Sequence, residues 1–283
     1  MGKKRTQATF GIILLIYLIC FVFRGIEYMF IRTDQSIFGE AFIHKLMGIG
    51  ILFIALKYLH IRASEIGFQP QKALKNVLYG LLLGVCAYTL AYGIEYSIHS
   101  MLGNSPSLQL YVTSYSVNGN LGNQTGLLFF AICIIGNIIN VVMEEGVFRG
   151  LFLKLAEKKY SFLIAVILSS VLFGFWHIAA PLRSFLNAER SFGGTLMMML
   201  MLVVTTGITG VKFCLLTKIS GSLWLPMADH FLNNTIINIL HISTITGVDE
   251  LQIVRITISQ TVSFIAVLLI FCKNKFYKRE TFR

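Results

Sequence analysis

The sequence predicts an all-α polytopic membrane protein, a bundle of about eight transmembrane helices with a polar cavity inside the membrane. Of its 283 residues, 55% are hydrophobic and 13% charged, and the mean hydropathy of +0.73 is too high for a soluble globular domain. The apolar residues also form runs of about 17 to 25 residues, the length that crosses a bilayer. Basic residues gather in alternate connections between these runs, as expected for helices that cross a membrane repeatedly.

Eight apolar runs are long enough to be spans, and the whole chain, 1–283, is predicted to be one integral membrane domain. They cover 9–30, 41–59, 76–98, 126–155, 162–179, 194–217, 221–241 and 252–272. The third run is the least apolar, but it contains Gly80 and Gly84. Small residues at this spacing let two helix backbones approach closely. The alternative interpretation is that they are ordinary glycines of a packed bundle.

With eight spans, five groups of basic residues fall on one side of the membrane. They are Lys3, Lys4 and Arg5; Lys57, Arg62, Lys72 and Lys75; Lys154, Lys158 and Lys159; Lys212 and Lys218; and Lys273, Lys275, Lys278, Arg279 and Arg283. The positive-inside rule therefore predicts that both termini are cytoplasmic, and we expect the plasma membrane of a prokaryote. The net charge of +11 does not indicate nucleic-acid binding, because no basic block is interleaved with aromatic residues. The expected partners are membrane lipid and a peptide or protein substrate.

Two glutamates and an arginine interrupt the fourth apolar run. Charges at bilayer depth cost several kcal/mol each by most estimates, so their retention suggests a use. In an α-helix Glu145 and Arg149 share one face, in the favourable order for an ion pair, whereas Glu144 is turned away by about 100°. Glu145 is then neutralised by Arg149 and Glu144 is left to face something else. The alternative is a purely structural ion pair between helices.

Two further polar clusters lie in apolar runs. Phe173 and His177 share a helical face in the fifth run, and His230 and Asn234 lie one turn apart in the seventh. At 1.5 Å per residue, Glu144, His177 and His230 lie roughly 20, 24 and 18 Å from the cytoplasmic ends of their helices. We therefore expect them to share a water-filled cavity. A glutamate and a histidine around a water can act as a hydrolytic base, and a histidine with an asparagine can donate to an oxyanion.

In order and spacing, these three motifs resemble those of the CPBP family, which includes type II CAAX prenyl proteases and the bacteriocin-processing or Abi proteins. The resemblance implies a membrane-embedded, glutamate-dependent endopeptidase that acts on a membrane-associated or prenylated peptide or protein. Glu144 would activate water with help from His177, and His230 and Asn234 would hold the scissile carbonyl oxygen. The implied supporting residues are Glu145, Arg149 and Phe173.

Two alternatives remain from the sequence. Glu144, His177 and His230 could be ligands of a catalytic zinc ion, although we expect no cofactor, and the chain lacks the His-Glu-x-x-His motif of other zinc proteases. A bacteriocin immunity or regulatory protein could also carry the same polar cavity without proteolysis. Asp229 has no assigned role; it could pair with a histidine or arginine, or cap a helix break after Pro226.

Overall fold

A computed structural model describes residues 2–113, 122–245, 247 and 249–280, with side chains described for 9–274 within these ranges. The described part is all-α and polytopic, and a long helix lies at each of the eight predicted places. These helices are α1 (Gly2–Ile26), α2 (Ile43–Tyr58), α3 (Ala73–Met101), α4 (Leu127–Glu144), α6 (Phe162–Trp176), α8 (Phe192–Ser220), α9 (Trp224–Ile239) and α10 (Gln252–Glu280). Shorter helical segments are η1 (Glu27–Ile31), η2 (Thr33–Gln35), η3 (Ala63–Ile66), η4 (Pro70–Lys72), η5 (Glu145–Phe152), α5 (Leu153–Glu157) and α7 (Ala179–Leu186).

Within the described residues, six helical segments are long and apolar enough to cross a membrane. They are Thr9–Ile31, Ala63–Met101, Leu127–Glu157, Phe162–Leu186, Phe192–Ser220 and Gln252–Asn274. Helices α2 and α9 have 16 residues each and so reach only about 24 Å, less than the hydrocarbon core of a typical bilayer. The chain is an integral membrane protein in which these two helices complete the bundle.

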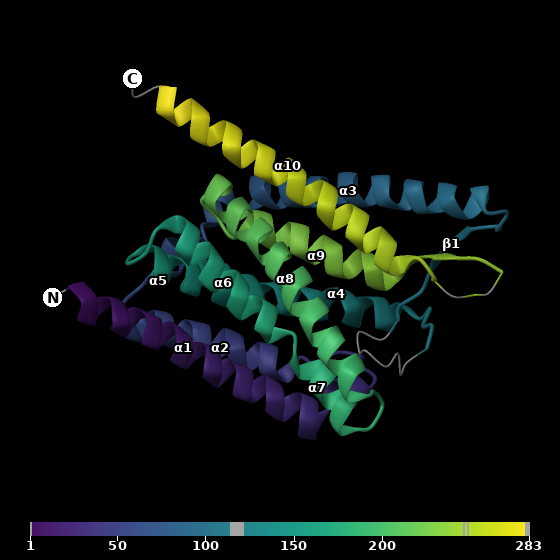
Figure 1. Cartoon of the computed structure of the whole chain (residues 1–283), viewed down its shortest axis with the longest axis horizontal. Coiled ribbons are helices and arrows are strands. Elements are labelled where there is room, and N and C mark those ends of the chain that lie inside the picture. The colour runs from purple at the N-terminus through teal and green to yellow at the C-terminus, as the bar shows by residue number, and fades with distance from the viewer. Residues whose placement is uncertain (1, 114–121, 246, 248, 281–283) are drawn as a thin grey trace.

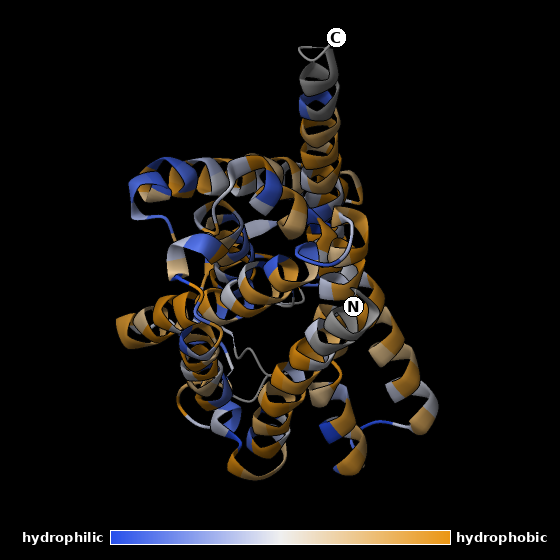
Figure 2. Ribbon diagram, turned by 90° about the vertical axis from the view of Figure 1, so that its left-hand side faces the viewer, coloured by the Kyte–Doolittle hydropathy of each residue, from blue (hydrophilic) through white to orange (hydrophobic). Residues whose placement is uncertain are grey.

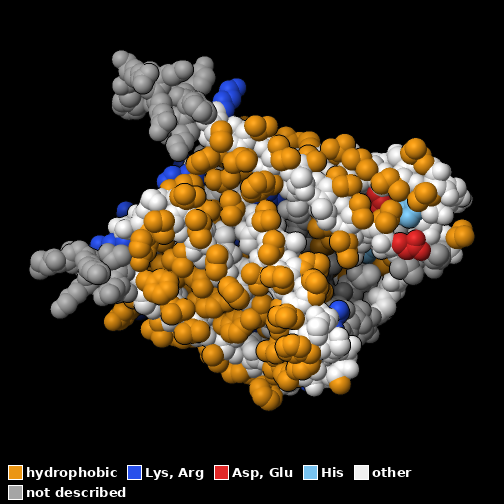
Figure 3. Space-filling view, viewed as in Figure 1, with side chains coloured by type: hydrophobic (Ala, Val, Ile, Leu, Met, Phe, Trp, Pro, Cys, Tyr) orange, Lys and Arg blue, Asp and Glu red, His pale blue; other side chains and the backbone are white. Residues whose placement is uncertain are grey.

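The helices form two groups that meet along α4, α8 and α9 (Figure 1). Helices α1 and α2 pack together at one side, and α3 packs against α9 and α10 at the other. Most ribbons are apolar, with hydrophilic residues mainly in the connections and helix ends (Figure 2). Lysines and arginines gather at one edge of a broad hydrophobic face, the edge toward which α1 begins and α10 ends (Figures 1 and 3). The basic side chains at 3–5 and 275–283 lie outside the described side chains, and cytoplasmic termini stay a prediction.

Two glycines let α3 and α9 approach closely, the first of the two interpretations of their spacing. A Cβ atom at Gly80 would clash with the backbone oxygen of Leu225, and one at Gly84 would clash with the side chain of Leu232. Gly93, in the same helix, has nothing within 4 Å of such an atom. The close approach therefore depends on the first two glycines and places α9, with its two predicted site residues, firmly against α3.

A short antiparallel strand pair ties the connection after α3 to the end of α9. Strand β1 (Ser107–Leu110) pairs with β2 (Leu240–Ser243), with Ser107 opposite Ser243. No strand was predicted here, because β1 is an exposed segment whose pairing depends on a strand at least 130 residues away. Residues 114–121 of the loop lie outside the described residues.

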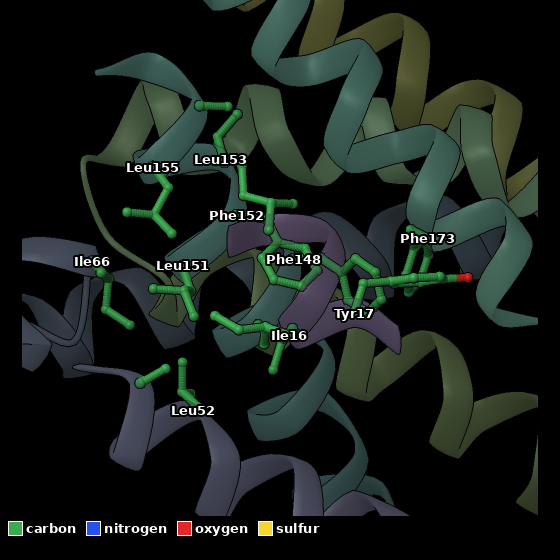
Figure 4. Packing of buried hydrophobic residues seen from close by; sticks show 14 of the residues in the cluster. Ile16, Tyr17, Leu52, Ile66, Phe148, Leu151, Phe152, Leu153, Leu155 and Phe173 are labelled. Atoms are coloured by element: carbon green, nitrogen blue, oxygen red, sulfur yellow. The ribbon is translucent and has the colours of Figure 1, made fainter. Parts of the chain in front are cut away.

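The main hydrophobic core surrounds Phe148, in the helical segment that follows α4 (Figure 4). The Phe148 ring meets the rings of Tyr17, Phe173 and Trp176 edge-on, with centroid distances of 6.4, 5.2 and 5.8 Å. Edge-to-face aromatic packing at these distances is favourable beyond the area that it buries. This core fixes the charged segment of the fourth span between α1 and α6.

Two basic side chains are buried in ion pairs. Lys212, predicted near the cytoplasmic end of α8, is only 1% exposed and lies 2.7 Å from Asp229. Because α8 continues to Ser220, Lys212 lies about 12 Å inside the helix end. The partner of Asp229 is thus a lysine, which was not among the predicted alternatives. Arg183 is likewise buried in α7 and pairs with Asp34 at 2.7 Å.

Candidate active site

The chain widens into a π-helix immediately after Glu144, where the sequence predicted an uninterrupted α-helix. This segment, η5, covers Glu145–Phe152, and π-helical turns often occur at functional sites. The predicted ion pair is present, with Arg149 Nη1 3.3 Å from Glu145 Oε1 and both side chains fully buried. The guanidinium also lies over the Phe173 ring, 3.8 Å from its centroid. Arg149 is therefore held by one carboxylate and one aromatic face.

Glu144 points away from that ion pair, as predicted. Its Oε1 accepts a hydrogen bond from Trp176 Nε1 at 3.0 Å, and its Oε2 lies 3.5 Å from Asn140 Nδ2. Neither partner was predicted. Asn140 lies one helical turn before Glu144, and Trp176 lies inside the Phe173–His177 motif, but only the packing of α4 against α6 shows that they converge on one carboxylate.

His230 lies between the two glutamates. Its Nδ1 is 2.9 Å from Glu145 Oε1 and its Nε2 is 3.7 Å from Glu144 Oε2. Because a carboxylate only accepts hydrogen bonds, Nδ1 carries a proton and Nε2 faces Glu144. The ring stacks on Phe213 with a centroid distance of 4.7 Å. The contact with Glu145 was not predicted, and it makes Glu145 a partner of both Arg149 and His230.

His177 follows the last residue of α6 as its C-cap. Its Nδ1 lies 2.9 Å from the backbone oxygen of Phe173, and the two rings meet edge-on at 4.8 Å. A backbone oxygen only accepts, so Nδ1 donates, and Nε2 of the neutral ring is left with a lone pair. Phe173 thus orients His177 through its backbone and supports Arg149 through its ring.

A cavity of about 670 Å³ joins the predicted catalytic residues. Its lining includes Glu144, His177, His230 and Asn234, while Glu145 and Arg149 lie behind the wall. Phe173, the third predicted supporting residue, also lines the cavity, and the roles of all these residues stay predictions. The remaining wall is mostly apolar and threonine-rich and comes largely from α8 and α10.

No group of three or more histidine, cysteine, aspartate or glutamate side chains in the described ranges is arranged to hold a metal ion. Of the three ligands in the zinc alternative, Glu144 and His230 come within 3.7 Å of each other. The expectation of a cofactor-free site remains a prediction.

One known family is similar to the segment that contains this site. Residues 126–236 match the family model described as type II CAAX prenyl endopeptidase Rce1-like. The matched segment begins just before α4, ends within α9 and contains all seven predicted site residues. Neither a curated protein nor a solved structure matches the chain. The segment that builds the polar cavity is therefore similar to the Rce1-like type II CAAX prenyl endopeptidase family.

Proposed function

We propose that the protein is an intramembrane endopeptidase in which Glu144 activates water to hydrolyse a peptide bond of a membrane-associated substrate. One observation carries this proposal. A buried carboxylate, held by an indole and an amide, opens onto the same cavity as two histidines and an asparagine. Such a site contains a base, groups that can stabilise an oxyanion, and room for a peptide.

In the proposed reaction, Glu144 takes one proton from a water molecule as the water oxygen bonds to the scissile carbonyl carbon. His177, whose Nε2 carries a lone pair, accepts a hydrogen bond from the same water and orients it. The carbonyl oxygen becomes an oxyanion that receives hydrogen bonds from His230 and Asn234. When the carbon–nitrogen bond breaks, Glu144 returns its proton to the leaving nitrogen, so that one water is consumed and the enzyme is restored.

The charges around His230 fit its proposed role. Arg149 pairs with Glu145, and His230 lies between Glu145 and Glu144. Buried charges are tolerated when they are paired, and each of the two carboxylates has a nitrogen partner here. In the proposed reaction His230 keeps its Nδ1 on Glu145 and turns its Nε2 edge toward the oxyanion.

The cavity wall favours a substrate that comes from the membrane. Met201 and Ile208 of α8 and Ile253 of α10 line the cavity and are also 42%, 51% and 70% exposed. Apolar residues that face both the cavity and the outer surface of an integral membrane protein offer a path from lipid to the site. A peptide with a prenyl or acyl group is therefore our proposed substrate class.

The experiment uses the full chain, purified in detergent and reconstituted in vesicles, with three matched peptides that carry a prenyl group, an acyl group or no lipid. Mass spectrometry identifies the products. We expect cleavage of a lipidated peptide by wild type and none by Glu144→Gln. If the variant retains full cleavage, the mechanism is wrong.

The same preparation tests the zinc alternative, and an assay in cells tests the immunity alternative. A zinc enzyme would lose activity with a chelator and recover it with added zinc, whereas we expect no effect of either. A protein that acts only in immunity would protect cells equally well as wild type and as Glu144→Gln. We expect this substitution to abolish the biological effect together with cleavage.

A further inference from the structure

A buried lysine begins a chain of side-chain hydrogen bonds that leads to the candidate site. Lys212 Nζ forms the ion pair with Asp229 and donates to Gln260 Oε1 at 2.8 Å and to Ser263 Oγ at 3.2 Å. An ammonium group has only donors, so the Gln260 atom that it contacts must be the oxygen. The orientation of an amide is usually ambiguous, but here the lysine fixes it.

The fixed amide of Gln260 determines that of Asn233. Gln260 Nε2 donates to Asn233 Oδ1 at 2.7 Å, and the Tyr88 hydroxyl donates to the same oxygen at 2.6 Å. Two donors on one oxygen leave Asn233 a single orientation, with its Nδ2 on the opposite side. That Nδ2 donates to Asn234 Oδ1 at 2.9 Å.

The chain ends at a residue of the cavity wall. Because Asn234 Oδ1 accepts from Asn233, the polar group that Asn234 can direct elsewhere is its Nδ2, which is a donor. An amide flipped by 180° has nearly the same shape but would present an oxygen to the site. An oxygen would repel an oxyanion that the NH₂ group would stabilise.

We propose that Lys212, Gln260 and Asn233 form a positioning relay that holds the Asn234 amide with its NH₂ group toward the scissile carbonyl oxygen. This inference rests on the proposed function. It also gives a role to Asp229, which neutralises Lys212 beside the cavity. The three relay residues line the same cavity as Asn234, and the role proposed for them is to position its amide.

Substitutions at Asn233 separate orientation from packing. Asn233→Asp keeps the shape and can still accept from Tyr88 and Gln260, but it places an acceptor against Asn234 Oδ1 and so favours the flipped amide. Asn233→Ala removes the constraint without inverting it. We expect kcat to fall by roughly 100-fold or more in Asn233→Asp and by about 10-fold in Asn233→Ala, with KM within about threefold of wild type. Gln260→Glu, which breaks the relay one step earlier, should lie between wild type and Asn233→Asp.

The matched control is Asn104→Asp. Asn104 is half-buried like Asn233 but lies in the connection after α3, where its Nδ2 contacts His99, so kcat should stay within about threefold. If Asn233→Ala is as impaired as Asn233→Asp, or if Asn104→Asp loses as much activity, the relay is wrong and the effect is one of packing or charge. Glu144→Gln is measured in the same assay. Cleavage that needs Glu144 but is unchanged in Asn233→Asp overturns the relay alone, whereas cleavage that does not need Glu144 overturns the proposed function.

Discussion

The indole nitrogen of Trp176 donates a hydrogen bond to Glu144 at 3.0 Å and so links the fifth predicted span to the proposed base. Trp176 is fully buried, and its ring also packs against Phe148. The Arg24 guanidinium lies over the same ring, with its carbon 4.6 Å from the ring centroid. The same side chain therefore contributes both to the core and to the orientation of Glu144. A substitution that keeps the ring but removes the N–H group separates these contributions.

Trp176→Phe should keep most of the packing and lose the hydrogen bond to the carboxylate. Hydrogen bonds to charged groups contribute about 1.5–3 kcal/mol, so we expect kcat to fall roughly 10- to 100-fold with KM little changed. Steady-state cleavage by purified protein checks this. A variant with wild-type kcat would show that the indole does not position Glu144.

Arg149→Met should destabilise the protein because it leaves Glu145 buried without its guanidinium partner. Breaking a buried pair on one side typically costs about 3–5 kcal/mol of unfolding free energy. Glu145→Gln combined with Arg149→Met should recover much of that stability without recovering activity, because His230 also loses its charged partner. Denaturant unfolding in detergent measures this free energy.

Lys218→Met is the control for that pair. Lys218 contacts Glu157 but is 45% exposed, and exposed ion pairs contribute less than about 1 kcal/mol. If Lys218→Met lowered the unfolding free energy as much as Arg149→Met, the claim that burial makes the Glu145–Arg149 pair important for stability would be wrong.

Gly80→Ala should weaken the contact between α3 and α9, because its methyl group would clash with the Leu225 backbone, which cannot move as a side chain can. Overpacking of this kind typically costs about 1–3 kcal/mol. Gly93→Ala, in open space on the same helix, should change stability by less than about 1 kcal/mol. Thermal unfolding of the two variants in one detergent compares them, and equal stabilities would argue against close helix packing.

Asp249 connects β2 to α10 through hydrogen bonds with His241 and Arg255, and acid should weaken this connection by protonating its carboxylate. Burial acts to raise the pKa of this carboxyl, but hydrogen bonds from His241 and Arg255 outweigh it and lower the pKa below its usual value. A lowered folded-state pKa gives stability that is present above the unfolded value, about 3.9, and is lost as pH falls through the folded value. Asp249→Asn should therefore be less stable than wild type at neutral pH, and the difference should shrink in strong acid. The measurement is the unfolding free energy of both proteins as a function of pH. A difference between them that stayed constant with pH would contradict the prediction.

Local patterns predicted much of this molecule. The lengths of the apolar runs located eight helices. The spacing of Glu145 and Arg149 predicted their ion pair, because a contact between residues four apart depends on one helix alone. The contact of His230 with Glu145 and the burial of Lys212 were not predictable in this way, because they depend on how α8 and α9 pack against other helices. The π-helix was missed for a related reason. It is stabilised by its surroundings, and its sequence reads as an ordinary α-helix.

The most direct measurement of the central claim compares the cleavage rates of Glu144→Gln and wild type under single-turnover conditions, with melting temperatures for both. We predict a loss of at least about 10⁴-fold, the scale expected when an essential catalytic group is removed, with a melting temperature within a few degrees of wild type. Glu144→Gln protein that is folded and cleaves at the wild-type rate would contradict the claim that Glu144 activates the water.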